Sequence, residues 1–435
     1  MIKPLSEEVL LRHMRDMDIE QISKATIRQA VSLSSSLESI LGEPFSRLEI
    51  GVPGLKACQE GIEAQKRALD DGIPAKYPSI EGLPALKNAA SKFLKAFVDI
   101  DVDPQCIVPT VGSMQGSYNL TLACSQLTPG RDTMLYIQPG FPANLTQANV
   151  LGVRHEAFDI YEYRGEKLRE KLESYFATGR ITALLFSNPN NPTWVCLTDD
   201  ELRIIGELAN KYDVIVLEDM AYLCMDFRND LSHPYQAPFQ PTVAKYTDNY
   251  VIMLSSSKIF SYAGERIALV AFNNTLFKRR YEALRERYGM ARLGQCFIHS
   301  FLYAASTGTS HSAQYAMAAM LQGAVDGTLD FVKDVSEYGR RAKIVKDIFV
   351  KNGFHIVYDH DGERPIADGF FFTAGYYDMD DETLMRALAR CGISAIGLNT
   401  TGSGQYGIRV CVSALCTDED FRRLDERLTL FAQNF

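Results

Sequence analysis

The strongest constraint on the fold is an alternation of short β-rich runs with helical stretches between about residues 105 and 272. Most of the intervening stretches carry helix-start signals, such as Thr198 followed by Glu201, a pair that can form a capping box. Such alternation predicts a parallel or mostly parallel sheet with helices on both faces. The expected strands are Ile107–Val111, Thr133–Ile137, Thr182–Phe186, Val214–Leu217, Tyr250–Leu254 and Arg266–Phe272.

The last third of the chain has a different rhythm. After Phe277 it reads as helical to about residue 350, and short strands and helices alternate again from there. We therefore expect a large domain over residues 56–310, with a mostly parallel, roughly seven-stranded sheet sandwiched by helices. A smaller α+β domain is expected over 311–435, joined by an N-terminal segment, residues 1–55. The expected elements of the small domain are strands near Phe354–Val357, Phe370–Thr373 and Ile408–Val412, and helices near Asp381–Ala389 and from Thr417.

Composition narrows the class of protein. With 45 basic and 54 acidic side chains, the chain carries a net charge of −9, which disfavours nucleic acid and anionic membrane surfaces as partners. Its nine cysteines form no CxxC pair and suit free thiols in a reducing compartment. The seven histidines form no HxH or HExxH pair, so no metal site is expected. No apolar run resembles a signal peptide or a membrane span, and we expect a soluble, cytoplasmic enzyme.

Two motifs are poor guides to function. Gly402–Gly407 spells GxGxxG, but a strand follows it where a dinucleotide-binding loop needs a helix, so we expect a flexible loop. Val214–Asp219 resembles the acidic strand end that holds magnesium in nucleotide hydrolases, but the chain has no GxxxxGK[ST] loop to accompany it. Asp219 still needs a partner, because a carboxylate that ends an apolar strand is costly when unpaired. By itself it fits a helix N-cap or an interdomain salt bridge.

Four polar segments mark the strand ends, where ligands bind in open α/β sheets. Ser187–Trp194, Glu218–Tyr222 and Ser255–Lys258 each follow a strand, and Gly264–Arg266 opens the next one. Asn191 and Asp219 are 28 residues apart, Tyr222 and Lys258 are 36 apart, and Lys258 and Arg266 are 8 apart. In this order and spacing the chain resembles the class I/II aminotransferases, which are pyridoxal-phosphate enzymes of the aspartate aminotransferase superfamily, fold type I. The resemblance runs from about Gly51 to Arg409.

The resemblance implies roles for the most distinctive residues. Pyridoxal phosphate is held by an amine as a Schiff base, and Lys258, set among three serines, fits that role and that of proton shuttle. Asp219 would keep the pyridine nitrogen protonated, because a neighbouring carboxylate favours the charged form. Tyr222 and Asn191 would hydrogen-bond the ring hydroxyl, although Tyr222 read alone fits simple packing and Asn191 fits a turn before Pro192.

Further cofactor ligands follow from the same resemblance. Gly112, Ser113 and Met114 lie between a strand and a helical run, where backbone N–H groups can point at a phosphate. Ser255 and Arg266 match the remaining phosphate ligands of the family. Phe141 would cover the cofactor ring, although a role in the core is nearly as good an explanation.

The substrate side of the site is also implied by the resemblance. Arg409 would clamp the α-carboxylate of the substrate together with Gly51 and Asn191, although an arginine on a half-buried strand can equally face solvent. Tyr77, in the segment Ala75–Pro78, would reach the cofactor phosphate of a neighbouring subunit, which implies a homodimer with shared sites. The alternative is that Tyr77 packs within its own subunit.

Three residues depart from the family pattern. Trp194 stands where glycine is usual, Gln138 where an acidic residue is frequent, and Ala268 where glycine is frequent. Because none of them bears on Lys258 or Asp219, we expect an aminotransferase that acts on an amino acid and a 2-oxo acid by ping-pong kinetics. The alternatives are a lyase, a decarboxylase or a cyclopropane-carboxylate synthase-like enzyme on the same fold, or a pyridoxal-phosphate-binding regulatory protein without turnover.

Overall fold

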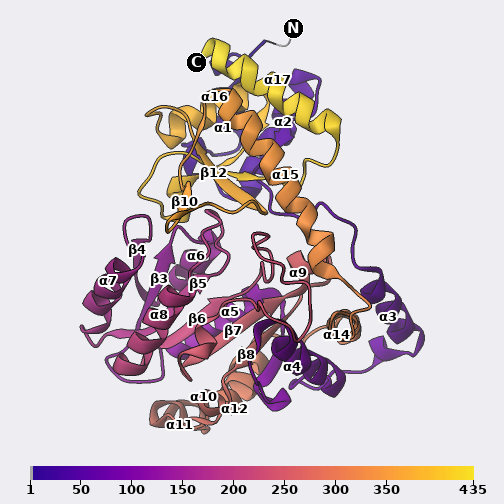
Figure 1. Ribbon diagram of the computed structural model, residues 1–435, viewed down its shortest axis with the longest axis vertical. Coiled ribbons are helices and arrows are strands. Elements are labelled where there is room, and N and C mark those ends of the chain that lie inside the picture. Colours follow the sequence, from indigo (N-terminus) through magenta and orange to yellow (C-terminus); the bar gives the residue numbers. More distant parts are fainter. Residues whose placement is uncertain (1–2) are drawn as a thin grey trace.

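A computed structural model describes residues 3–435 of the protein (Figure 1). It contains two large hydrophobic cores, one for each domain. The larger core surrounds a seven-stranded sheet, and the smaller core combines N-terminal residues such as Leu10 and Leu48 with the C-terminal part of the chain. The first helix of the chain, α1, and the last, α17, therefore both lie in the small domain, at the top of Figure 1. Within residues 3–435, no helix is long and apolar enough to cross a membrane.

The large sheet has the strand order β2-β8-β7-β6-β5-β3-β4. Strand β8 runs antiparallel to β2 and β7, and the remaining pairs are parallel, which confirms the expected mostly parallel sheet. Strand β4 was not among the expected strands, because it is a half-exposed edge strand of mixed polarity. The bounds are β2 (Ile107–Val111), β3 (Thr133–Gln138), β4 (Arg154–Asp159), β5 (Ile181–Ser187), β6 (Ile215–Asp219), β7 (Tyr250–Ser255) and β8 (Ile267–Phe272).

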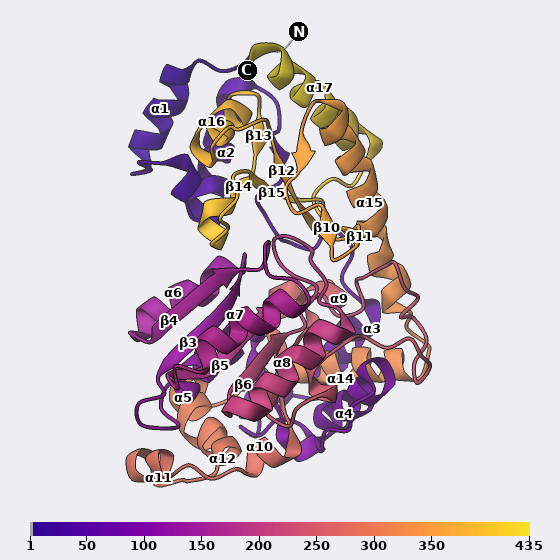
Figure 2. The same cartoon turned by 60° about the vertical axis from the view of Figure 1, so that its left-hand side comes forward.

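Helices cover both faces of this sheet (Figures 1 and 2). The expected capping box is present at the start of α8: Glu201 N donates to Thr198 Oγ1 at 3.2 Å, and Thr198 N donates to Glu201 Oε2 at 2.9 Å. The bounds are α3 (Gln59–Asp70), α4 (Pro84–Val98), α5 (Gly112–Cys124), α6 (Pro142–Leu151), α7 (Glu166–Phe176), α8 (Asp199–Tyr212), α9 (Ser256–Ile259), α10 (Asn274–Lys278), α11 (Glu282–Tyr288), α12 (Leu293–Cys296), α13 (Tyr303–Ser306) and α14 (His311–Val325).

The small domain is built on an antiparallel sheet of order β14-β15-β12-β9. The N-terminal segment joins it through β1, which pairs in parallel with β13. The bounds are α1 (Glu7–Asp16), α2 (Ile27–Leu41), β1 (Ser46–Arg47), α15 (Phe331–Lys351), β9 (His355–Ile356), β10 (His360–Asp361), β11 (Arg364–Pro365), β12 (Phe371–Gly375), α16 (Asp381–Arg390), β13 (Ile393–Ser394), β14 (Ile396–Gly397), β15 (Ile408–Cys411) and α17 (Asp418–Asn434).

The two cores separate further along the chain than residue 310, where the sequence analysis places the boundary. Helix α14 packs against α3 and α4 in the large domain, and Phe331 and Val332 still belong to the large core. Val335 belongs to the small core, so the change of domain falls inside α15. The sequence shows no break there because one continuous helix serves both domains, as Figures 1 and 2 show.

Candidate active site

The polar segments identified in the sequence meet at one edge of the large sheet. Strands β5, β6 and β7 are parallel, with Ser187 paired to Asp219 and Asp219 paired to Met253. Asp219 is the last residue of β6, and Lys258 lies in α9, immediately after β7. The small domain lies over this edge (Figures 1 and 2). The carboxyl ends of the strands and the small domain thus enclose the site expected of an open α/β sheet.

Asp219 is a half-buried carboxylate with little local compensation. Its Oδ1 accepts a hydrogen bond of 3.0 Å from Ala221 N. Burial raises the pKa of Asp219 to about 6, and the backbone hydrogen bond from Ala221 only partly opposes this. A cation against this carboxylate would offset the cost of burying its charge. Asp219 therefore fits contact with a protonated ring nitrogen, and its place at a strand end leaves it open to the site.

Lys258 is a half-buried amine that faces the small domain. Its Nζ donates a hydrogen bond to the backbone oxygen of Gly51 and lies 5.2 Å from the centre of the Phe370 ring. Burial lowers the pKa of Lys258 to about 8, and the nearby Arg409 cation acts in the same direction. An amine that loses its proton near neutral pH is a better nucleophile and base than an exposed lysine. Lys258 is therefore suited to covalent attachment of an aldehyde.

Arg409 brings a fixed cation from β15 into the same space. The side chain is buried, and its guanidinium lies 4.6 Å from the centre of the Phe371 ring. Its Nη1 donates to Asn191 Oδ1 at 3.3 Å and its Nη2 donates to the backbone oxygen of Glu49. Within residues 3–435, Arg409 Nε has no hydrogen-bond partner. Arg409 thus combines a buried charge with an unused donor, a combination that suits a carboxylate ligand.

Asn191 connects the two domains and is more than a turn residue. Its Nδ2 donates to the Tyr222 hydroxyl at 3.4 Å, while its Oδ1 accepts from Arg409 as described above. The Tyr222 ring lies at centroid distances of 5.2 Å from Trp194 and 5.7 Å from Phe371. Burial raises the pKa of Tyr222, so its hydroxyl stays protonated and can donate. Tyr222 therefore both packs and presents a polar group to Asn191.

The start of α5 forms a cradle for an anion. Gly112 has a φ of +67° and donates its N–H to the backbone oxygen of Arg266 at 2.9 Å. A Cβ atom at Gly112 would collide with Arg266 Nη2, so glycine keeps the guanidinium close to the helix. Ser113 and Met114 occupy the first turn, whose N–H groups have no partner in an α-helix, and Ser255 caps the neighbouring α9. These donors fit the phosphate of the expected cofactor.

Of the two other expected cofactor ligands, Phe141 lies near the strand ends and Tyr77 does not. Phe141 precedes α6 and lines a small pocket of about 20 Å³ with Gln138, Ser187 and Thr401. That cavity opens beside the end of β5, so Phe141 lies next to the strand ends as expected. Tyr77 does not join the cluster: its side chain is 93% exposed, in the connection between the 3-10 turn Ile73–Ala75 and α4.

The glycine-rich segment 402–407 is a loop, as expected, and it makes contacts with the large domain that the sequence does not predict. Gly404 N donates to Asp159 Oδ2 at 2.8 Å, and just before the segment the backbone oxygen of Thr401 accepts from Gly140 N at 2.8 Å. A small-domain loop therefore docks on the large domain beside Phe141. Sequence reasoning missed this contact because its partners are far apart along the chain and share no local motif.

Comparison with known proteins points to the aminotransferases. The family model described as "Aminotransferase class I and II" matches residues 45–428. A probable aspartate aminotransferase of Methanocaldococcus jannaschii is 27% identical over 77% of this chain and 80% of its own length. An aspartate aminotransferase of Pyrococcus horikoshii is 26% identical over 59% of this chain, and the match spans 62% of that protein.

Solved structures share the fold at lower identity. An aspartate aminotransferase from Thermus thermophilus with maleate superimposes with a TM-score of 0.72 at 20% identity, covering 97% of this chain and 98% of its own. An aminotransferase from Mycobacterium tuberculosis gives a TM-score of 0.76 at 17% identity, covering 94% of this chain and 96% of its own. The expected two-domain α/β architecture is therefore confirmed.

Proposed function

Because this chain belongs to the aminotransferase class I and II family of pyridoxal-phosphate enzymes, we propose that it is a transaminase that moves an amino group between an L-amino acid and a 2-oxo acid. The observation that carries the proposal is that Lys258 and Arg409, which come from different domains, donate to two backbone oxygens of one short segment, those of Gly51 and Glu49. A nucleophilic amine beside a carboxylate-binding cation suits the α-amino and α-carboxyl groups of one substrate.

Residues of the large domain would carry out the chemistry. When bound, pyridoxal phosphate supplies an aldehyde that exchanges amines and a ring that withdraws electrons from the substrate α-carbon. Lys258 Nζ would hold the aldehyde between turnovers, and once free it would serve as the base that takes the substrate α-proton and gives it back. Asp219 keeps a proton on the ring nitrogen, and Asn191 and Tyr222 hydrogen-bond the ring hydroxyl.

The remaining residues would bind the substrate and the cofactor and hold them in place. Arg409 would pair with the substrate α-carboxylate through its fork of N–H groups, beside Asn191, to which it already donates. The Gly51 backbone is the third proposed substrate contact. The positive end of α5 and the Arg266 cation would hold the phosphate, and Phe141 would cover the ring. The proposed phosphate ligands are Ser113, Met114, Ser255 and Arg266. Gly112 was also expected to bind the phosphate, but its N–H donates to the Arg266 backbone, and its part is to keep the Arg266 guanidinium beside the helix.

Single-turnover analysis tests the reaction class. Purified protein loaded with pyridoxal phosphate is mixed with each member of a panel of L-amino acids, without any oxo-acid acceptor. A transaminase releases one equivalent of 2-oxo acid per site and leaves the cofactor in its amine form, and a Lys258→Ala variant does neither. Catalytic release of ammonia, carbon dioxide or a side-chain fragment under these conditions would instead support the lyase, decarboxylase or synthase alternatives.

We also propose a homodimer in which Tyr77 completes the site of the neighbouring subunit. The 93% exposure of this aromatic side chain supports the proposal, because a partner surface would cover it. Subunits carrying Lys258→Ala are mixed with subunits carrying Tyr77→Phe, after each variant alone is shown to be impaired. Activity returns in mixed dimers if Tyr77 acts across the interface, because one site then has both residues. Mixed dimers no more active than their parents would rule out the shared site.

A cytoplasmic location is the third part of the proposal. All nine cysteines are free thiols, and seven of them are buried, which suits a reducing compartment. Fractionation of cells that express the tagged chain is expected to recover it with cytoplasmic markers. Recovery with membranes or in an oxidising compartment would contradict this location.

A further inference from the structure

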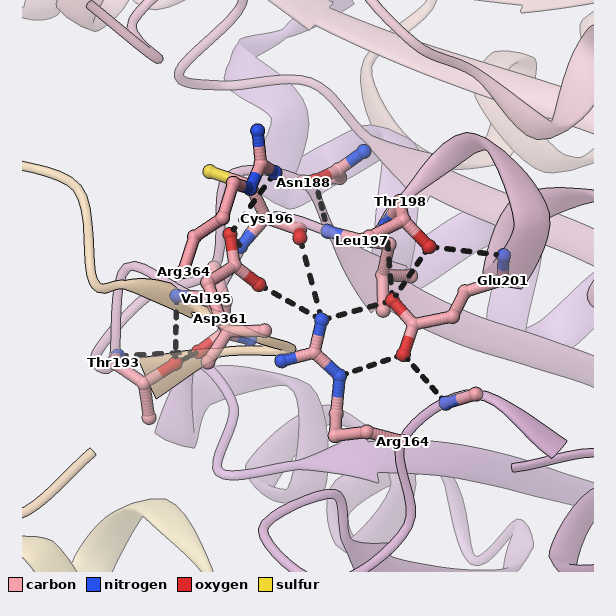
Figure 3. A network of polar contacts seen from close by, with 12 residues as sticks. Arg164, Asn188, Thr193, Val195, Cys196, Leu197, Thr198, Glu201, Asp361 and Arg364 are labelled. Carbon is pink, nitrogen blue, oxygen red and sulfur yellow. Dashed lines mark hydrogen bonds and ion pairs between the residues drawn. The ribbon is translucent and has the colours of Figure 1, made fainter. Parts of the chain in front are cut away.

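A hairpin of the small domain places one carboxylate inside the large domain. Strands β10 and β11 pair antiparallel and carry Asp361, whose side chain is fully buried. Its Oδ1 accepts from Arg164 Nη2 at 2.8 Å, and its Oδ2 accepts from Arg228 Nη2 at 2.7 Å. Both arginines belong to the large domain, and Figure 3 shows the Arg164 side of this network. Asp361 thus makes two charge-assisted contacts between the domains.

The two arginines do not need Asp361 for charge balance. Arg164 already forms a bidentate pair with Glu201, with N–O distances of 2.7 and 2.8 Å. Arg228 forms another with Asp226, with both distances at 2.7 Å. The large domain therefore presents two internally neutral pairs whose remaining N–H groups are aimed at a third carboxylate. Loss of the Asp361 charge would leave neither arginine unpaired, so the large domain should keep its fold without it.

Asp361 also holds the loop that carries Asn191. Cys196 N donates to Asp361 Oδ2 at 3.3 Å, and the backbone oxygen of Cys196 accepts from Arg164 at 3.5 Å. The same loop folds back on itself, because Asn190 N donates to Val195 O at 2.9 Å. The peptide that Asp361 fixes is therefore linked by a short backbone turn to the residue next to Asn191.

Small-domain groups thus hold this loop at both ends, Arg409 through Asn191 and Asp361 through Cys196. We propose that Asp361 is a positioning residue that sets the small domain on the Asn191 loop, and so aligns Asn191 with Arg409 for the substrate α-carboxylate. This inference rests on the proposed function for the role of those two groups. Asp361 itself touches neither of them, and it acts through the loop and through the placing of the domain.

The test is an Asp361→Asn variant, which keeps the size of the side chain and removes its charge. We expect the KM for the amino acid to rise about tenfold, a size typical of residues that act on a site through others. The kcat and the cofactor content should change little, because Lys258 and Asp219 belong to the large domain. Glu363→Gln removes an exposed carboxylate from the same hairpin and should leave KM unchanged. Asp361→Glu, which keeps the charge, should recover part of the loss.

A second measurement needs no turnover. Hydrogen exchange of the amides between residues 190 and 197 should be faster in Asp361→Asn than in Glu363→Gln, whether or not the protein transaminates. If the wild type shows no transamination but the exchange difference is present, the positioning role stands and the proposed function fails. A folded Asp361→Asn variant with wild-type KM and wild-type exchange would overturn the inference.

Should that variant not fold, Arg228→Gln removes one of the two cationic contacts and is expected to shift KM and exchange in the same directions, less strongly. Wild-type values in that variant would also overturn it.

Discussion

The two halves of the candidate active site are held in different ways. In the large domain, Asp219 and Lys258 follow neighbouring strands whose backbone hydrogen bonds determine their spacing. In the small domain, Arg409 comes from another sheet, and its place over the site depends on contacts between domains, such as the one with Asn191. Changes in the large-domain half should therefore slow bond breaking, whereas changes in the small-domain half should weaken substrate binding.

The largest effect that separates the halves is expected from Asp219→Asn. Loss of the carboxylate removes the proposed partner of the ring nitrogen, so removal of the substrate α-proton should slow by about 10³-fold. Exchange of the α-hydrogen with deuterium, followed by NMR, measures this step. Cofactor content should remain that of the wild type, because the phosphate cradle and Lys258 are unchanged.

Glu218→Gln is the matched control for that variant. Glu218 is the neighbouring buried carboxylate on β6, but it accepts hydrogen bonds from Thr242 Oγ1 at 2.6 Å and Val243 N at 3.1 Å, away from the site. Its replacement should leave exchange close to the wild-type rate. Equal losses in both variants would show that Asp219 acts through stability rather than through the cofactor.

A smaller effect, on substrate binding rather than on bond breaking, is expected from Arg409→Lys. Lysine keeps the charge but not the planar fork, so the KM for the amino acid should rise about 100-fold while kcat changes less. Steady-state kinetics with the amino acid and with the corresponding amine, which lacks the carboxylate, separates the two contributions. The variant and the wild type should handle the amine alike. A loss of kcat at unchanged KM would break the division between the halves.

The smallest expected effect is the change with pH in the rate of cofactor attachment to Lys258, a large-domain residue that lies near Arg409 of the small domain. Burial, helped by the Arg409 cation, lowers the pKa of Lys258 from 10.5 to about 8. Only the neutral amine attacks an aldehyde, so the attachment rate of cofactor-free protein should rise about tenfold from pH 7 to pH 9 and level off. Stopped-flow absorbance measures this rate. A rate that keeps climbing beyond pH 10 would contradict the lowered pKa, and Arg409→Gln should move the midpoint upward.

The large-domain half was open to prediction from sequence. The residues 214–217 before Asp219 are apolar without alternation, which is the pattern of a buried parallel strand, so the polar residues after it had to lie at the ligand-binding edge. Strand β4 was not predicted, because this edge strand has no clear alternation of apolar and polar residues and carries charges such as Arg154 and Glu156.

The contacts between the domains were not predictable in the same way. Trp194 marks a departure from the family pattern, but its partner cannot be read from the sequence. In the structure Trp194 has a φ of +66° and is fully buried against Gly369, where a Cβ atom would collide with the indole. Asp361 is likewise an ordinary hairpin residue until the fold brings Arg164 and Arg228 around it. Such pairs join segments far apart in the chain and leave no periodicity or motif.

Borohydride reduction of the cofactor-loaded protein, followed by peptide mapping, tests the central claim most directly. Reduction makes the bond between lysine and cofactor permanent, and mass spectrometry then locates the added mass. We expect a single adduct on the peptide that contains Lys258, which should be absent from a Lys258→Ala variant. An adduct on another lysine of the wild-type protein, or none after incubation with pyridoxal phosphate, would contradict the assignment of Lys258.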